Sequence, residues 1–311
     1  MNSIDLHCDT ALRLFHEDLK LKKSICKVDI EKLKKAKALA QVFATFIELD
    51  CVDNPYSEFK RIYNNLVKEI EANSKDIVIV RNLDELDRAS NNGKIGAFLS
   101  IEEGEVLEGK IERVKEMYDL GIRFITLTWN FPNSIGYPNS NLEHKDKGLT
   151  ERGKEIVAEM ERFGIIPDCS HLSDAGFYDL IDICNKPFIA THSNAREVTN
   201  HPRNLTDDMI VKLANKGGVM GLNFCAPFLG DKKVPTIEDM ISHLKYTRNV
   251  GGIDVLALGT DFDGIENEVE VENIGEIGKL AYALSKNGFN DDEIDKIFFG
   301  NVKRVMKECL K

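Results

Sequence analysis

Six residues that could bind a metal ion are spread along the 311-residue chain, and each closes or follows a short apolar run. Imidazole nitrogens and carboxylate oxygens suit zinc or a similar divalent ion, and a carboxylate can bridge two ions about 3.5–4 Å apart. A fold that brought the six together would therefore create a two-metal hydrolytic site. The residues are His7, Asp9, Glu102, His171, His192 and Asp261.

The apolar runs are typical of strands in a parallel sheet. They alternate with amphipathic helical stretches from one end of the chain to the other, which is the pattern of repeated βα units. Helices are expected over 57–74, 150–163, 205–215 and 236–249, among others. Eight strands are expected, at about 3–9, 39–47, 96–101, 123–128, 164–170, 187–192, 217–223 and 255–261.

Eight βα units predict an α/β fold in which one (β/α)8 TIM-type barrel takes up residues 1–311 as a single domain. Residues 291–310 are expected to form a C-terminal helical extension, interrupted at Gly300. In such a barrel, the C-terminal ends of all strands converge on one face. The six candidate ligands should therefore meet there.

Each histidine motif is weak evidence when it stands alone. His7 and Asp9 are two residues apart on an expected strand, so both can face the barrel interior while Cys8 faces outward. Such a pair could also be a polar strand end. His171 in DCSH and His192 in ATHS could each be an ordinary buried histidine. Their shared placement at strand ends favours a metal site.

The acidic motifs need a cation to explain them. Glu102 lies in SIEEGE beside Glu103 and close to Glu105, where three carboxylates would repel one another. Two divalent ions would stabilise them in the ionised form. In GTDFDG, we assign chemistry to Asp261 and structural hydrogen bonding to Asp263.

Composition excludes some classes of function. The formal net charge of −11 disfavours nucleic-acid binding and attraction to anionic membranes. The N-terminus lacks a basic segment followed by an apolar one, and no stretch approaches the roughly 20 apolar residues of a membrane span, so a cytoplasmic protein is expected. The seven cysteines form no CxxC pair, which argues against both a disulfide framework and a thiolate zinc site.

Taken together, the motifs resemble the membrane dipeptidase family, also called renal dipeptidases, over almost the whole chain. The resemblance implies a barrel of the amidohydrolase type that binds two zinc ions per chain and hydrolyses small dipeptides. It rests on DLHCDT (5–10), SIEEG (100–104), RFITLT (123–128), GLTERGKEIVAEMERFGIIPDCSHLS (148–173), THSNAR (191–196), HPRNLTDD (201–208), GTDFDG (259–264) and GNVKRV (300–305).

The resemblance also implies a role for each candidate ligand. His7 and Asp9 match the ligands of one zinc ion, His171 and His192 match those of the other, and Glu102 matches the bridge between them. A metal-bridging hydroxide would then attack the scissile carbonyl of the dipeptide.

Three further positions follow from the same resemblance. Asp261 matches the catalytic carboxylate that moves the water proton to the leaving amine. Arg203 matches the arginine that holds the substrate's C-terminal carboxylate. Trp129 departs from the family, because many members place at this position a histidine that helps to stabilise the tetrahedral intermediate. Its indole N–H could replace that donor, or its ring could simply wall the substrate pocket.

Two other functions are compatible with the same motifs. A related barrel hydrolase could act on an N-acyl amino acid, a lactone or a cyclic amide with the same metals. A binding protein without activity could keep the fold, although retention of all six metal-site residues argues against it. The sequence is compatible with a homodimer and does not specify the preferred dipeptides.

Overall fold

A ring of parallel strands forms the centre of the molecule in the computed structural model, which describes residues 2–311. Neighbouring strands follow the order β6-β5-β4-β2-β1-β8-β7, and every pairing is parallel. The strands are β1 (Ser3–Asp5), β2 (Ala38–Phe46), β4 (Ile95–Glu102), β5 (Ile122–Thr126), β6 (Ile166–Asp168), β7 (Met220–Leu222) and β8 (Leu256–Leu258).

A short extended segment closes the ring between β6 and β7. Ile189 forms a parallel bridge with Asp168, and Ala190 forms one with Met220. The eighth member predicted over 187–192 is therefore only a pair of bridges. The predicted (β/α)8 barrel is confirmed, with strands that are mostly shorter than expected.

One strand was missed. β3 (Ile77–Ile79) pairs with the first half of β4, at the edge that β5 takes over further along. It lies outside the barrel ring. Its three residues, between charged neighbours in SKDIVIVRN, are too few to produce a recognisable apolar pattern.

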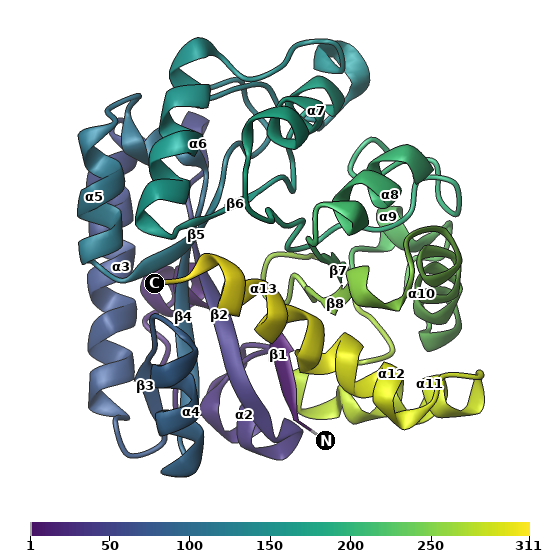
Figure 1. Ribbon diagram of the computed structural model, residues 1–311. Helices are drawn as coiled ribbons and strands as arrows, with labels where there is room; N and C mark the ends of the chain where they lie inside the picture. The colour runs from purple at the N-terminus through teal and green to yellow at the C-terminus, as the bar shows by residue number, and fades with distance from the viewer. Residues whose placement is uncertain (1) are drawn as a thin grey trace.

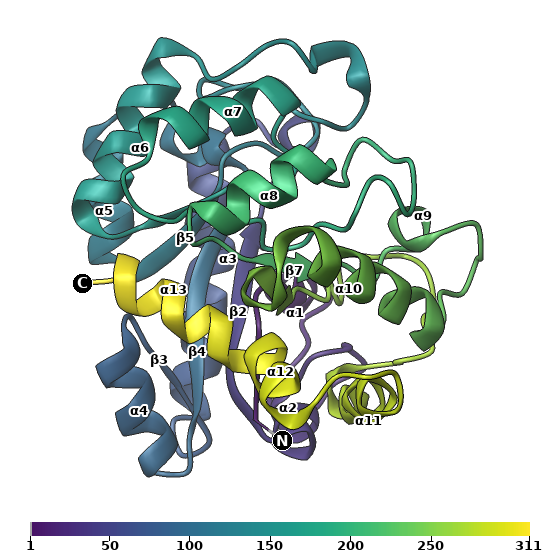
Figure 2. The same cartoon turned by 45° about the vertical axis from the view of Figure 1, so that its right-hand side comes forward.

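Helices surround the strands on all sides (Figures 1 and 2). Several begin at a threonine: Thr150, Thr206 and Thr236 each accept a hydrogen bond from the first turn of their helix. The helices are α1 (Thr10–His16), α2 (Ile30–Ala36), α3 (Pro55–Ala72), α4 (Leu83–Asn91), α5 (Glu112–Asp119), α6 (Glu151–Phe163), α7 (Asp174–Ile183), α8 (Asp207–Asn215), α9 (Ala226–Leu229), α10 (Ile237–Gly251), α11 (Gly278–Lys286), α12 (Asp291–Asp295) and α13 (Asn301–Cys309).

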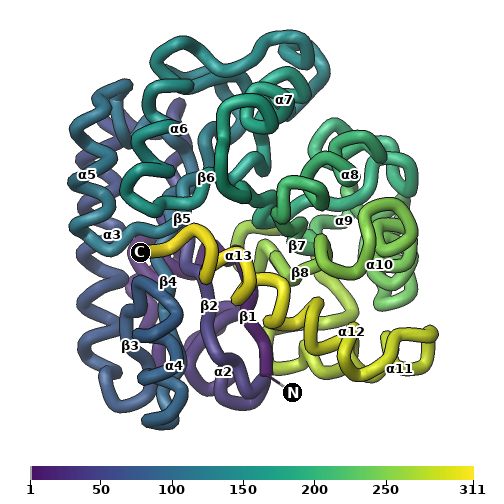
Figure 3. The backbone as a smooth tube through the Cα atoms, viewed as in Figure 1, coloured from purple at the N-terminus to yellow at the C-terminus, as the bar shows by residue number. Residues whose placement is uncertain are grey.

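The C-terminal extension packs against one end of the barrel. Val302, Val305 and Met306 of α13 belong to the same buried cluster as Val42 and Phe98 of the strands. Figure 3 shows this segment crossing the strands. The expected interruption at Gly300 is instead a π-helical stretch, Lys296–Gly300, that joins α12 to α13 without a break. α13 therefore helps to seal the end of the barrel away from the candidate ligands.

No helix within residues 2–311 has both the length and the apolar character that crossing a membrane requires.

Candidate metal centre

The six candidate ligands converge at the carboxyl ends of the strands. Glu102 is the last residue of β4, whereas His7, His171 and Asp261 lie just beyond the ends of β1, β6 and β8. Asp9 is the residue before α1, and its side chain makes no capping hydrogen bond to that helix. His7 and Asp9 are thus not on the strand that the sequence predicted over 3–9, because β1 ends at Asp5 and the chain turns toward the site.

Tight backbone turns direct several of these side chains. His171 has a φ of 68° and Asp261 a φ of 61°, in the left-handed region that non-glycine residues rarely adopt. Hydrogen bonds hold both turns: Asp261 N donates to His7 O at 3.2 Å, and Asn139 N donates to His171 O at 2.7 Å. These turns end the strands earlier than the apolar pattern suggests.

Glu102 lies between two groups of ligands. Its Oε2 is 3.1 Å from His7 Nε2, and its Oε1 is 3.1 Å from His171 Nε2 and 3.6 Å from His192 Nε2. The two oxygens of one carboxylate therefore face different histidines. We call these groups the His7 half and the His171–His192 half.

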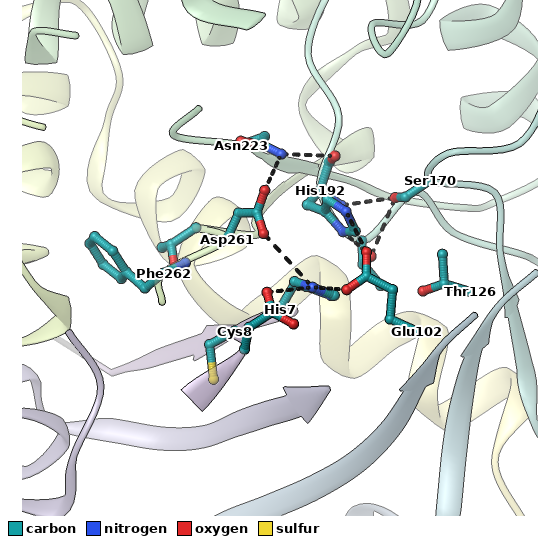
Figure 4. A network of polar contacts seen from close by, with 12 residues as sticks. His7, Cys8, Glu102, Thr126, Ser170, His192, Asn223, Asp261 and Phe262 are labelled. Atoms are coloured by element: carbon teal, nitrogen blue, oxygen red, sulfur yellow. Dashed lines mark hydrogen bonds and ion pairs between the residues drawn. The ribbon is translucent and has the colours of Figure 1, made fainter. Parts of the chain in front are cut away.

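The His7 half is rich in carboxylates. His7 Nε2 lies 3.4 Å from Asp9 Oδ2 and 3.8 Å from Asp261 Oδ1, and Figure 4 shows it between Asp261 and Glu102. Burial alone would lower the pKa of His7, but the carboxylates of Glu102 and Asp9 outweigh it and raise this pKa well above its usual value. Burial, followed by repulsion from Glu102, raises the pKa of Asp9. The local field thus favours positive charge.

The His171–His192 half consists of two imidazoles that face each other, with their Nε2 atoms 3.0 Å apart. Burial and the nearby Arg203 guanidinium lower the pKa of His171 to about 4. Burial, His7 and Arg203 lower that of His192 well below its usual value. Both shifts favour the neutral imidazole, which is the form that binds metals.

The residues present fit divalent cations. Asp9 Oδ1 is buried and has no hydrogen-bond partner among the residues that the structure describes. Two neutral imidazoles can share only one proton between facing nitrogens, so a cation satisfies both lone pairs better. Ligand atoms of His7, Glu102 and His192, and of His7, Asp9 and Asp261, lie within 4.8 Å of one another. Nitrogen and carboxylate ligands of this kind suit zinc.

Asn223, which the sequence reasoning missed, fixes Asp261. Its Nδ2 donates to Asp261 Oδ2 at 2.9 Å and to His192 O at 3.3 Å (Figure 4). Asn223 follows β7, so its place at a strand end was a signal that could have identified it. Burial raises the pKa of Asp261. The structural role predicted for Asp263 is confirmed, since it accepts hydrogen bonds from Thr10, Arg13 and the backbone near Lys27.

Arg203 is a buried cation with free donors. The residue is only 3% exposed, and its Nη2 donates to His192 O at 3.3 Å. Nε and Nη1 have no hydrogen-bond partner within residues 2–311. The guanidinium lies over the ring of Phe228, 5.3 Å from its centroid. Unpaired guanidinium donors in a buried position suit an anion such as a carboxylate.

A cavity of about 560 Å³ opens over the ligands. Its polar lining includes Asp9, Glu102, His171 and Asp261. Trp129 is in its wall and packs edge-on against Phe46, with ring centroids 4.8 Å apart. Other apolar residues complete the wall: Leu12, Pro227, Phe228 and Ile265. Asn130 also lines the cavity.

Comparison with known sequences gives a match over the whole chain. The profile of the membrane dipeptidase family, peptidase family M19, matches residues 1–311. An uncharacterised dipeptidase of Schizosaccharomyces pombe is 29% identical over 298 residues, which cover 90% of this chain and 71% of that protein. Dipeptidase tcpJ of Claviceps purpurea is 27% identical over 295 residues, which cover 90% of this chain and 69% of that protein.

Solved structures share the fold. The metallopeptidase called dipeptidase AC, of family M19, superimposes with a TM-score of 0.91 at 24% identity, covering 99% of this chain and 98% of that one. A metallopeptidase from Rhodobacter sphaeroides, bound to a phosphinate mimic of L-Ala-D-Ala, gives a TM-score of 0.91 at 23% identity and covers 99% of both chains.

Proposed function

The chain belongs to the membrane dipeptidase family, peptidase family M19, and we propose that it hydrolyses the peptide bond of free dipeptides with two bound zinc ions. The observation that carries the proposal is the position of Glu102, whose two carboxylate oxygens face two separate groups of ligands. One carboxylate shared in this way suits a pair of metal ions.

Each half of the centre would hold one ion. His7 and Asp9 would bind the first, His171 and His192 the second, and Glu102 would bridge them. When bound, the ions would supply a hydroxide nucleophile at neutral pH and polarise the scissile carbonyl. Proton transfer and substrate binding would then fall to side chains of this chain.

Asp261 is suited to moving the proton. Asn223 holds Oδ2, so Oδ1, which faces His7, is the oxygen that can take up a proton. Burial raises the pKa of Asp261, which makes its carboxylate a stronger base and lets it pass the proton on to the leaving amine.

Arg203 would bind the substrate's C-terminal carboxylate through Nε and Nη1, for which the described part of the chain offers no hydrogen-bond partner. Arg203 comes after the sixth member of the ring, whereas Phe46 ends the second, so the two lie on opposite sides of the barrel. A dipeptide anchored at Arg203 would therefore extend its N-terminal residue toward Phe46 and Trp129.

Trp129 is better suited to forming an apolar wall of this pocket than to donating a hydrogen bond from its indole N–H to the reaction intermediate. Its ring packs against Phe46 and lies 5.9 Å from Phe131 and 6.3 Å from His171, between centroids. Its backbone N–H donates to Glu103, which fixes the segment in place. We infer that the ring contacts the side chain of the substrate's N-terminal residue.

A hydrolysis screen with metal analysis tests the proposal. The purified protein should bind close to two zinc ions, lose activity on chelation, and cleave L-Ala-L-Ala or L-Ala-D-Ala. His171→Ala should lower the metal content. N-acetylalanine, a γ-lactone and a cyclic amide are the comparison substrates.

Faster turnover of one of these comparison substrates would overturn the dipeptide assignment. Full zinc occupancy with no hydrolysis of any substrate would indicate a binding protein. Full zinc occupancy and full activity in His171→Ala would remove the proposed metal site.

A further inference from the structure

Thr191 and Asp168 are two buried side chains that lie behind the ring of His192. They play no part in the site described so far. His192 Nδ1 lies 2.7 Å from Thr191 Oγ1, and Thr191 Oγ1 lies 2.5 Å from Asp168 Oδ2. Each of the three residues is at most 1% exposed. The contacts therefore form a continuous chain, shielded from water, that ends at the ring of a candidate metal ligand.

The direction of the hydrogen bonds in this chain follows from Asp168. Its Oδ1 accepts from Ser170 N and Thr191 N at 2.9 and 2.8 Å, and its Oδ2 accepts from Thr126 Oγ1 and Thr191 Oγ1 at 2.5 Å each. A carboxylate only accepts, so the single hydroxyl proton of Thr191 points to Asp168. The hydroxyl oxygen can then only accept from His192, which places the ring proton on Nδ1 and leaves a lone pair on Nε2.

We propose that Asp168, acting through Thr191, is a positioning residue that sets the tautomer and ring orientation of His192 for metal binding. The inference rests on the proposed metal centre, toward which Nε2 points: it lies 3.0 Å from His171 Nε2 and 3.6 Å from Glu102 Oε1. Partners of the second nitrogen of a metal-bound histidine typically contribute about 10–100-fold to metal affinity.

Thr191→Val is the first test. Valine keeps the shape of the side chain but removes the hydroxyl that accepts from His192. Zinc should bind about 10–100-fold more weakly at one of the two sites, and Thr191→Ser should restore the affinity because it restores the hydroxyl. Thr126→Val is the matched control, since it removes an equally short hydrogen bond from the same Asp168 oxygen without contacting His192.

Asp168→Asn is the sharper test because it should reverse the chain. The two backbone N–H groups that donate to Oδ1 hold the amide oxygen at that position, so the amide NH2 takes the place of Oδ2. It would donate to Thr191, whose hydroxyl would then donate to His192 Nδ1 and force the ring proton onto Nε2. The affinity lost should equal or exceed that of Thr191→Val, although the side chain is nearly unchanged in size.

Zinc affinity, measured by competition with a chelator, is the readout, with thermal unfolding of each variant as the control for folding. Long-range ¹H–¹⁵N spectra of histidine-labelled protein report the His192 tautomer directly. Equal affinities for Thr191→Val and Thr126→Val, or a wild-type tautomer in Asp168→Asn, would overturn the inference. If Asp168→Asn fails to fold, the comparison of Thr191→Val with Thr126→Val decides. Wild-type protein that binds no zinc would instead overturn the proposed function.

Discussion

The two halves of the candidate metal centre differ in their charge and in the kind of ligand they offer. In the His7 half, one imidazole is surrounded by Glu102, Asp9 and Asp261 within 3.8 Å. In the His171–His192 half, two imidazoles share a single carboxylate oxygen and lie within the influence of the Arg203 cation. The first half carries excess negative charge. The second offers the nitrogen lone pairs of two imidazoles that favour the neutral form.

The His7 half is suited to attracting a cation by its charge, whereas the His171–His192 half depends on the orientation of its imidazole rings. Excess carboxylate attracts a cation whatever the detailed ring geometry, because Coulomb energy is not strongly directional. A neutral imidazole binds only through the lone pair of one nitrogen, so its tautomer has to be held. The structure agrees with this distinction, since His192 Nδ1 contacts Thr191 and His171 Nδ1 lies 3.3 Å from Asn130 Oδ1.

Glu102 is shared by both halves, so its replacement should have the largest effect. Glu102→Gln keeps the size of the side chain but removes the charge that faces His7 and His171. We expect loss of both zinc ions and of all measurable hydrolysis, a larger effect than any single substitution within one half. Glu105→Gln, in the same motif but hydrogen-bonded to Ser134 outside the cavity, is the control. A Glu102→Gln enzyme that retained two ions would show that the halves are independent.

Asp261 belongs to the His7 half but should act on the proton rather than on the ion. Asp261→Asn should lower kcat by about 10²–10⁴-fold, the usual contribution of a general acid–base group. Zinc content should stay close to that of the parent, because Asp9 and Glu102 remain. Metal analysis beside steady-state kinetics separates the two effects. Loss of zinc in proportion to activity would make Asp261 a ligand instead.

Arg203 lies beside the His171–His192 half, and its replacement should affect substrate binding most. Arg203→Ala should raise KM for free dipeptides, because truncating one partner of a buried charge pair costs about 2–5 kcal/mol. Amidating the substrate's C-terminus should harm the parent enzyme far more than the variant. KM values for a dipeptide and its amide, measured on both proteins, provide the check. An equal increase in KM on amidation in both proteins would assign Arg203 a different role.

Trp129 is outside both halves and should have the smallest effect on kcat. Trp129→Phe keeps an aromatic wall against Phe46, so kcat should change little. If the indole N–H stabilised the reaction, the loss would approach 10²-fold, as on removal of one oxyanion donor. Trp129→Ala should change the ranking of dipeptides that differ in their first residue. An unchanged ranking would place Trp129 outside the substrate pocket.

Much of the fold could be predicted from the sequence, because periodicity and the placement of residues at strand ends are local properties. Alternating apolar runs and helical stretches predict the barrel, and the polar residues that end the runs predict which side chains meet. Strand lengths were overestimated where the chain turns early, as at His171 and Asp261 with their positive φ values. β3 was missed because its three residues are too few for any period to appear, and the strand predicted over 187–192 is reduced to single bridges at Ile189 and Ala190.

The sequence by itself determined which residue types stand at the ends of the apolar runs, and hence the candidate chemistry. The family resemblance already implied a division into two halves, but only the tertiary structure gives its geometry, because Glu102 faces His7 with one oxygen and His171 with the other only after distant strands have closed into a ring. The same holds for Asn223 beside Asp261 and for Thr191 behind His192. Hydrogen bonds and charges act over a few ångströms in space, and no spacing along the chain specifies those distances.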